Sequence, residues 1–306
     1  MEIPEQPSFK SGFVAVVGRP NVGKSTLINR FLGQKIAAVS PKPQTTRHQQ
    51  LGILSNDHAQ IIFTDTPGMH LAHTKLGEHM NEAVENALVD CDVILFLVDL
   101  SQPPNEEDQI LADRLKALRA ASPVLMVLNK VDMLEESNLA GRQTRYQALL
   151  PESQSFQISA LDGTNIPELL EAILAQLPFG PPFYPDDQIT DLYERDIAAD
   201  LIREAALNHL QDEVPHGVAV RIDEFTERGD DGAYIAATLF TERDSHKGIV
   251  IGAGGEKVKV ISMQARKEIE KMSGRKVFLR LRVKVRKNWR NDDFFLSSFS
   301  GSGRQE

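Results

Sequence analysis

The sequence predicts an α/β domain with a mostly parallel sheet, followed by a smaller α+β domain. Three observations indicate this division. Short apolar runs alternate with helix-compatible segments in the first part of the chain, a proline-rich stretch interrupts the pattern near residue 180, and strand-like alternation with strong positive charge marks the last part. A length of 306 residues, 41% of them hydrophobic, suits two folded domains.

The first domain begins with a predicted strand at 13–17, a loop that starts at Gly18, and a helix whose apolar residues recur up to Leu32. Further strands are predicted at 60–64, 93–98, 124–128 and 155–158, with helices between several of them, as at 107–120, and a last helix at 166–177. Strands that alternate with helices favour a largely parallel sheet.

The stretch 177–185 is too rich in proline for a helix or a central strand, and its aromatic residues favour a semi-rigid connector. We therefore expect a flexible tail at 1–11, the first domain at 12–178, a linker at 179–186 and the second domain at 187–306. In the second domain we expect a helix at 191–210, strands at 218–225 and 233–240 joined by a hairpin turn at 229–232, a helix ending near Gly274, and a strand at 276–286.

Charge is distributed unevenly along the chain. Residues 247–290 hold 14 Lys and Arg against 3 Asp and Glu, a local charge of +11, so the rest carries −20 within a total of −9. The basic segment favours a polyanion as the partner. Two alternatives are that its basic face is only solvated, or that it binds an anionic lipid surface. A single cysteine excludes an intramolecular disulfide, and the absence of a long apolar run or a signal peptide leads us to expect a cytoplasmic protein.

The segment Gly18-x-x-x-x-Gly23-Lys24-Ser25 matches the P-loop pattern between a predicted strand and a helix. Backbone amides and the helix N-terminus would hold phosphates, Lys24 would reach the β- and γ-phosphates, and the Ser25 hydroxyl would ligate Mg²⁺. The expected nucleotide-binding residues of this loop are Gly18, Asn21, Val22, Gly23, Lys24, Ser25 and Thr26. This pattern alone leaves ATP and GTP open.

The segment Asn129-Lys130-Val131-Asp132 favours guanine. It follows a predicted strand, which places Asp132 at the edge of the sheet where open α/β sheets bind ligands. A carboxylate there can accept hydrogen bonds from the ring N–H and the amine of guanine. A site built for such groups discriminates by as much as ~10⁴-fold. Ser159 and Ala160 follow the last strand and can present a backbone amide to the guanine carbonyl.

Asp65-Thr66-Pro67-Gly68 follows another strand and suits an acidic residue that holds Mg²⁺ through water, with the Gly68 amide directed at the γ-phosphate. Thr45 and Thr46 lie in a proline-punctuated loop at 40–48, a candidate switch loop, and we choose Thr46 as the magnesium ligand. The predicted metal ligands are thus Ser25, Thr46 and Asp65. The predicted catalytic residues are Lys24, Thr46 and Gly68.

In chain order these five motifs resemble the complete set of the translation-factor-like GTPases, specifically the Era-like group. The resemblance implies a P-loop GTPase domain that uses GTP, GDP and Mg²⁺ and converts GTP and water to GDP and phosphate. In relatives of this group an asparagine at the position of Asn21 can ligate K⁺. Met69 stands where Ras-type enzymes have a glutamine that orients water, so we expect slow intrinsic hydrolysis.

The order helix, two strands, Gly252-Ala253-Gly254-Gly255, helix, strand resembles a type II KH domain of the kind found in this group, whose GxxG loop clamps a nucleic-acid backbone. No polar residue lies between the glycines, so phosphate attraction is expected from Lys247, Lys257 and Lys259. The predicted RNA-binding residues are Lys247, Gly252, Ala253, Gly254, Gly255, Lys257, Lys259, Arg280, Arg282 and Lys284. The tail after Trp289 departs from the resemblance.

The resemblance implies a switch that binds single-stranded RNA in the 3′ region of 16S ribosomal RNA and assists processing of that RNA and assembly of the small (30S) ribosomal subunit. We expect a monomer. Two alternatives stay open. One is an RNA-binding assembly protein whose nucleotide state only gates the KH surface. The other is a membrane-linked switch, peripheral at the inner face of the cell membrane.

Overall fold

The computed structural model describes residues 9–40, 42, 45–70, 72–118, 122–227 and 232–298. Two compact units are present. The first comprises Met1–Gln34, Thr46–Leu71 and His79–Asp191, and the second comprises Lys35–Thr45, Ala72–Glu78 and Leu192–Glu306. The predicted switch loop at 40–48 therefore contributes to both units, and so does the segment after Gly68.

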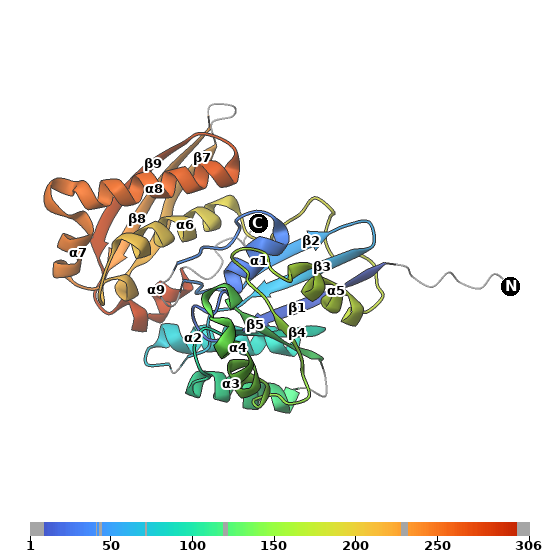
Figure 1. The fold of residues 1–306 in the computed structure, drawn as a ribbon. Coiled ribbons are helices and arrows are strands. Elements are labelled where there is room, and N and C mark those ends of the chain that lie inside the picture. Colours follow the sequence, from blue (N-terminus) through green and yellow to red (C-terminus); the bar gives the residue numbers. More distant parts are fainter. Residues whose placement is uncertain are drawn as a thin grey trace. The chain divides into compact units, whose positions relative to one another are not determined.

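The sheet of the first unit contains six strands in the order β2-β3-β1-β4-β5-β6, all parallel to their neighbours except β2 (Figure 1). The mostly parallel sheet that we predicted is confirmed. The elements up to residue 176 are β1 (Lys10–Val17), α1 (Lys24–Leu32), β2 (Gln50–Ser55), β3 (Ala59–Asp65), α2 (Lys75–Val89), β4 (Val93–Asp99), α3 (Glu106–Leu118), β5 (Val124–Asn129), the 3-10 helix η1 (Val131–Met133), α4 (Glu136–Gln147), β6 (Gln154–Gln157) and α5 (Ile166–Gln176).

Apolar side chains cover both faces of this sheet, which is why its central strands read as continuous apolar runs. One face packs alternate residues of β1, β4 and β5 against α2, α3 and α4, with Phe96 and Tyr146 among the fully buried side chains. On the other face, Phe31 of α1 stacks on Phe63 of β3 with ring centroids 4.7 Å apart. The loops at the carboxyl ends of the strands are therefore built on a rigid base.

Strand β2 was not predicted. Gly52 and the polar residues at both ends interrupt its apolar run, so its sequence alone is a weak strand signal. It forms because it pairs antiparallel with β3 over its full length, from Gln50 opposite Asp65 to Ser55 opposite Gln60. This pairing brings Gln50 next to the end of β3.

The predicted tail and linker both contain residues that pack on the first unit. Strand β1 begins at Lys10, inside the stretch 1–11 that we expected to be a tail. The Ser11 hydroxyl donates to the carbonyl of Pro181 at 2.6 Å, and the ring of Phe183 packs edge-on against Phe13. The backbone N–H of Tyr184 donates to the side chain of Gln60 at 2.9 Å. The proline-rich stretch thus packs against this unit in a defined conformation.

The second unit has a three-stranded sheet of order β7-β8-β9, in which β7 and β8 are antiparallel and β8 and β9 are parallel. Figure 1 shows α6 and α8 lying across one face of this sheet. The elements are α6 (Glu194–His209), the 3-10 helix η2 (Pro215–Gly217), β7 (Ala219–Glu227), β8 (Ala233–Thr241), α7 (Asp244–Ile251), the 3-10 helix η4 (Ala253–Gly255), α8 (Glu256–Ser273), β9 (Val277–Val285), the 3-10 helix η5 (Trp289–Asn291) and α9 (Asp293–Ser297).

One apolar core joins α6, α7 and α8 to the sheet, with Leu201, Ile235 and Ile261 among its buried members. The segment after Trp289, which we described as divergent, includes α9. Trp289 is buried and its indole N–H donates to the carbonyl of Gly217 at 2.9 Å. The hairpin turn predicted at 229–232 lies outside the described residues except for Gly232. Across the described part of the chain, no helix combines the length and apolar composition needed to cross a bilayer.

Candidate nucleotide site and nucleic-acid interface

The predicted nucleotide motifs meet at one edge of the first sheet. Strands β1, β3, β4, β5 and β6 run parallel, so the loops that follow them emerge at the same edge. The order in which strands are added to the sheet reverses at β1, because β3 lies on one side of it and β4 on the other. Open α/β sheets bind ligands at such a position.

The P-loop connects β1 to α1 with a backbone path that depends on glycine. Gly23 has φ of 105°, and a Cβ atom there would lie 2.3 Å from the side-chain nitrogen of Asn129. Asn21, with φ of 64°, is also left-handed, Val22 is buried, and Thr26 lies in the first turn of α1. The chain therefore passes close to the sheet before the helix begins.

Lys24 folds back over this loop. Its Nζ donates to the carbonyls of Gly18 and Arg19, each at 3.0 Å. Burial lowers the pKa of Lys24 to about 8, against the opposing negative charges of Asp65 and Glu107. The Lys24 ammonium can therefore contact anionic oxygens bound by the P-loop. Their negative charge would favour the protonated form of Lys24.

The three predicted metal ligands converge. The Ser25 hydroxyl donates to Oδ2 of Asp65 at 2.7 Å, the Ser25 and Thr46 hydroxyl oxygens are 2.9 Å apart, and Thr46 donates to the same Asp65 oxygen at 3.3 Å. The neighbouring Thr45 turns away and donates to the carbonyl of Lys42 at 2.8 Å. Thr46 is thus the threonine that faces the carboxylate.

Asp65 is in an unusual electrostatic environment. Burial raises its pKa, although the Ser25 hydrogen bond and the charge of Lys24 act in the opposite direction. Gln50 donates to Oδ2 at 3.1 Å, whereas Oδ1 is buried and has no hydrogen-bond partner among the described residues. Two hydroxyls and a carboxylate with an unsatisfied oxygen form an all-oxygen donor set, which suits a hard divalent cation such as Mg²⁺.

Gly68 and Met69 occupy different environments. Gly68 passes so close to the P-loop that a Cβ atom there would lie 2.5 Å from the nitrogen of Pro20. Met69 donates its N–H to the carbonyl of Gly18 at 3.3 Å, and its side chain packs, partly buried, on the apolar core of the sheet. A thioether in that position has no strong hydrogen-bonding group with which to orient water.

The motif at 129–132 joins the P-loop to the last loop of the site. The Asn129 side chain donates to the carbonyl of Val22 at 2.7 Å and accepts from the N–H of Ala160 at 2.9 Å. Asn129 and Ser159 are buried, whereas Asp132 is exposed in η1. Asn129 therefore holds two loops together, and the Asp132 carboxylate is available for a base.

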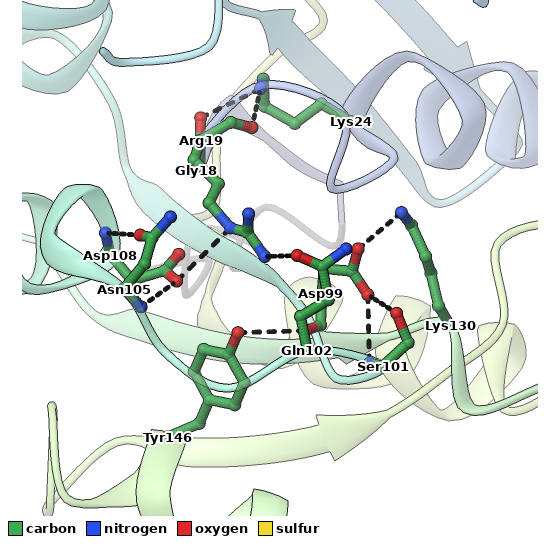
Figure 2. Close-up of polar contacts among 10 residues, drawn as sticks. All are labelled: Gly18, Arg19, Lys24, Asp99, Ser101, Gln102, Asn105, Asp108, Lys130 and Tyr146. Carbon is green, nitrogen blue, oxygen red and sulfur yellow. Dashed lines mark hydrogen bonds and ion pairs between the residues drawn. The ribbon is translucent and has the colours of Figure 1, made fainter. Parts of the chain in front are cut away.

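Arg19 and Asp108 belong to a polar network beside the site that sequence reasoning missed (Figure 2). Arg19 of the P-loop lies 3.4 Å from Asp108, whose side chain accepts from the N–H of Asn105 at 3.1 Å. Asn105 in turn accepts from the N–H of Asp108, which completes a capping box at the start of α3. The Asn-x-x-Asp spacing before a helical segment was the available signal. Burial raises the pKa of Asp108 despite the backbone N–H of Asn105 and the nearby Arg19.

A second part of this network contacts Lys130 of the motif at 129–132. Lys130 has a left-handed backbone and its Nζ pairs with Asp99 at 2.7 Å (Figure 2). The Tyr146 hydroxyl donates to the carbonyl of Asp99 at 3.0 Å, and Ser101 donates to its carboxylate at 2.6 Å. Asp99 ends β4, so an acidic residue directly after an apolar run marks this contact in the sequence.

The Gly252–Gly255 loop joins two helices, as the GxxG prediction requires. Helix α7 ends at Ile251 and α8 starts at Glu256, while Gly252, Gly254 and Gly255 all have positive φ. A Cβ atom on Gly252 would lie 2.8 Å from that of Lys257. Gly254 and Gly255 have nothing within 4 Å of such an atom, so the backbone is accessible at these two glycines. The exposed Lys259 and half-buried Lys247 and Lys257 lie on the flanking helices.

The predicted RNA-binding residues of β9 lie on the face of the sheet opposite the helices that flank the GxxG loop. In β9, alternate residues point to opposite sides of the sheet. Leu279, Leu281 and Val283 pack on the core under α6 and α8, whereas Arg280, Arg282 and Lys284 are exposed on the reverse face. The basic residues that we grouped as one site are therefore divided between the helix face and the open face of the sheet.

Comparison with protein families supports both domains. The family described as a 50S ribosome-binding GTPase matches residues 13–130, and the family described as a KH domain matches residues 213–290. The two matches include the P-loop and the GxxG loop respectively.

Among the solved structures similar to this chain, two match it over nearly its full length. One is Era in complex with MgGDPNP and nucleotides 1506–1542 of 16S ribosomal RNA, 39% identical, with a TM-score of 0.90 over 95% of this chain and 98% of that chain. The other is a point variant of Era from Aquifex aeolicus bound to GDP·AlF4⁻, 39% identical, with a TM-score of 0.89 over 95% of this chain and 99% of that chain.

Proposed function

This chain belongs to the Era family of GTPases with a C-terminal KH domain, and from this membership we propose that it hydrolyses GTP and binds the 3′ region of 16S ribosomal RNA. The observation that carries the enzymatic part is the convergence of Ser25, Thr46 and Asp65, with an unsatisfied carboxylate oxygen, next to the buried Lys24. The proposed phosphate-binding lysine is thus next in the chain to Ser25, one of the proposed metal ligands.

The nucleotide is GTP or GDP with Mg²⁺. Ser25 and Thr46 would ligate the ion and Asp65 would hold it through water, and the ion would supply positive charge to the phosphate oxygens. Lys24 binds the same oxygens, and the Gly68 amide is directed at the γ-phosphate. Asp132 accepts from guanine, and the Ala160 amide donates to the guanine carbonyl. Lys24, Thr46 and Gly68 thus stabilise the charge that develops during transfer to water.

Intrinsic hydrolysis is slow in this proposal because Met69 packs on the core and has no group to orient water. K⁺ ligated by Asn21 near the phosphates would supply positive charge, an idea based on the resemblance to K⁺-using relatives. Single-turnover hydrolysis in KCl and in NaCl at equal ionic strength tests it. Faster hydrolysis in KCl, abolished by Asn21→Ala, supports K⁺, and equal rates in both salts exclude it.

The KH domain binds single-stranded RNA through the GxxG loop, where Gly254 and Gly255 leave the backbone accessible and Lys247, Lys257 and Lys259 attract phosphates. Through this RNA the protein takes part in assembly of the small ribosomal subunit as a cytoplasmic monomer. A lipid-binding role at the inner membrane face is the competing assignment for the same basic surface.

The test of the RNA assignment uses the full chain with a GTP analogue and an RNA spanning nucleotides 1506–1542. Lys257→Glu with Lys259→Glu lowers RNA affinity and the steepness of its salt dependence, because two phosphate contacts become repulsive. Glu256→Gln, a neighbouring change that removes negative charge, serves as the control and leaves binding intact or slightly stronger. GTP affinity stays unchanged in all variants. Unaltered RNA affinity in the double variant, or tighter binding to phosphatidylserine vesicles than to RNA, overturns the assignment.

A second candidate function differs only in turnover. If the nucleotide state changes RNA affinity while hydrolysis stays negligible on the small subunit, the protein acts as a gated RNA-binding assembly factor. The basic domain and complete P-loop allow that outcome, and measuring both quantities on the same RNA separates the two functions.

A further inference from the structure

We propose that the open face of the KH sheet is a second binding surface for single-stranded RNA, separate from the GxxG loop and resting on the proposed RNA-binding function. We call it the sheet platform and define it by Tyr234 of β8 and Phe278, Arg280, Arg282 and Lys284 of β9. None of the three helices that cover the other face is part of it.

The aromatic part of the sheet platform comes from strand register. Tyr234 pairs with Phe278 across β8 and β9, and their rings stack with centroids 5.7 Å apart and planes 13° apart. Phe278 is 65% exposed, although aromatic side chains of this size are usually covered. An exposed ring next to a stacked partner offers a π-face to a base, and base stacking on such rings is tolerant of sequence.

The basic part follows from the two-residue period of the strand. Arg280, Arg282 and Lys284 project from the same face at intervals of roughly 6.6 Å, since a parallel strand rises about 3.3 Å per residue. This interval is on the order of the separation between consecutive phosphates in a single strand. Within the ranges that the structure describes, no carboxylate lies within ion-pair distance of Arg280 or Arg282.

Strand β7 limits where a polyanion can lie. Asp223 pairs with Arg221 at 2.9 Å and accepts from Thr238 at 2.6 Å, so the charge of Arg221 is largely compensated. Glu224 of β7 pairs with Ala236 of β8, and Ala236 pairs with Arg280 of β9. The acidic residues of β7 therefore border the open face on the side away from β9. An RNA backbone would follow the β9 edge, with its bases directed toward Tyr234 and Phe278.

The sheet separates the platform from the GxxG loop. Leu279 and Leu281 of the same strand point into the core that α7 and α8 share, so the GxxG loop and the Arg280 side chain belong to opposite faces. A GxxG loop clamps four nucleotides. We therefore assign the platform a flanking single-stranded segment of the same RNA, which reaches it around β9, the edge strand of the sheet.

The experiment compares two probes on the full chain with a GTP analogue: an RNA spanning nucleotides 1506–1542, and five-nucleotide pieces of it. Phe278→Ala lowers affinity for the long RNA by roughly tenfold and leaves the best short piece unchanged, because the short piece is held by the GxxG loop alone. Arg280→Ala with Arg282→Ala also weakens only the long RNA, and reduces the slope of log affinity against log salt by about 1.4. Phe278→Trp restores affinity, since stacking is retained.

Two controls match these changes. Phe294→Ala removes an aromatic ring of α9 that is 84% exposed, and Lys267→Ala with Lys271→Ala removes two exposed charges of α8; both leave the long RNA bound as before. Normal long-RNA affinity in the platform variants, with Lys257→Glu and Lys259→Glu still disruptive, overturns the platform alone. Equal losses on both probes show one continuous site and also overturn it. No binding of either probe by the unmodified protein refutes the proposed RNA function together with the platform.

Discussion

The side-chain oxygen of Thr46 lies 2.9 Å from that of Ser25, although the two residues belong to a loop and a helix that are separate in the chain. Both hydroxyls are within hydrogen-bond distance of the same oxygen of Asp65. Thr45, the adjacent threonine, makes its hydrogen bond with Lys42 instead. The two threonines therefore form a matched pair for testing the proposed metal site.

Thr46→Val should lower the rate of GTP hydrolysis by roughly 10- to 100-fold, which corresponds to losing a ligand interaction of a charged site worth about 1.5–3 kcal/mol. GDP affinity should change little, because in the proposed mechanism this loop closes only when a γ-phosphate is present. Thr45→Val is the control and should retain near-normal hydrolysis. Single-turnover rates over a Mg²⁺ titration provide the measurement, and equal effects of the two substitutions would contradict the assignment.

Asp132→Asn should reduce GTP affinity by as much as ~10⁴-fold and favour xanthosine nucleotides, because the amide now donates where guanine also donates. The exposed Glu135 lies just after η1, so Glu135→Gln removes a nearby charge without touching the base and should leave GTP affinity unchanged. Competition between GTP and XTP at fixed Mg²⁺ measures the change. Unaltered GTP affinity in Asp132→Asn would refute guanine recognition at this position.

Asn129→Asp should destabilise the first unit by about 2 kcal/mol, because a carboxylate cannot donate to the buried carbonyl of Val22. The carboxylate can still accept from the N–H of Ala160, so the substitution should weaken the contact with the P-loop and keep the contact with the loop at Ala160. Urea unfolding and GDP affinity are measured together. Asn138→Asp, at an exposed position of α4, is the control for the added charge. Normal stability in Asn129→Asp would show that the two loops do not depend on this bridge.

Arg19→Met should destabilise the protein by about 3 kcal/mol at pH 7, because it leaves the buried Asp108 carboxylate without its cation. Adding Asp108→Asn should recover part of this loss, since the amide oxygen can still accept from the N–H of Asn105. Urea unfolding of the single and double variants measures the coupling between the two side chains.

The pH dependence of the Arg19→Met variant follows from the pKa of Asp108, which burial already raises in the intact protein. A raised pKa means that the folded state binds more protons than the unfolded state, so stability falls as pH rises through that range. The loss caused by Arg19→Met should accordingly shrink as pH is lowered from 7 through the raised pKa of Asp108. A loss that is constant with pH, or one that persists in full in the double variant, would contradict a charge-based role for Arg19.

Most of the fold was predictable because the central strands β3, β4 and β5 are buried along their whole length and read as largely apolar runs. Strand β2 was missed because its stability comes from pairing with β3 and not from its own composition. The α9 segment was missed for a related reason, since Phe295 and Trp289 are buried against other parts of the second unit.

For the candidate site, the sequence by itself determined which residues lie on loops after strands, and the parallel order of those strands then places the motifs at one edge. Only the tertiary structure decided that Thr46 and not Thr45 faces Asp65, that Asn129 spans two loops, and that Arg19 pairs with Asp108. These contacts join residues distant in the chain, and no local spacing encodes them. Strand β9 is a similar case, because its alternation of apolar and basic residues was visible in the sequence but the faces of the sheet were not. Leu279 and Leu281 pack on the core in the folded structure, and Arg280 and Arg282 therefore lie on the opposite face from the GxxG loop.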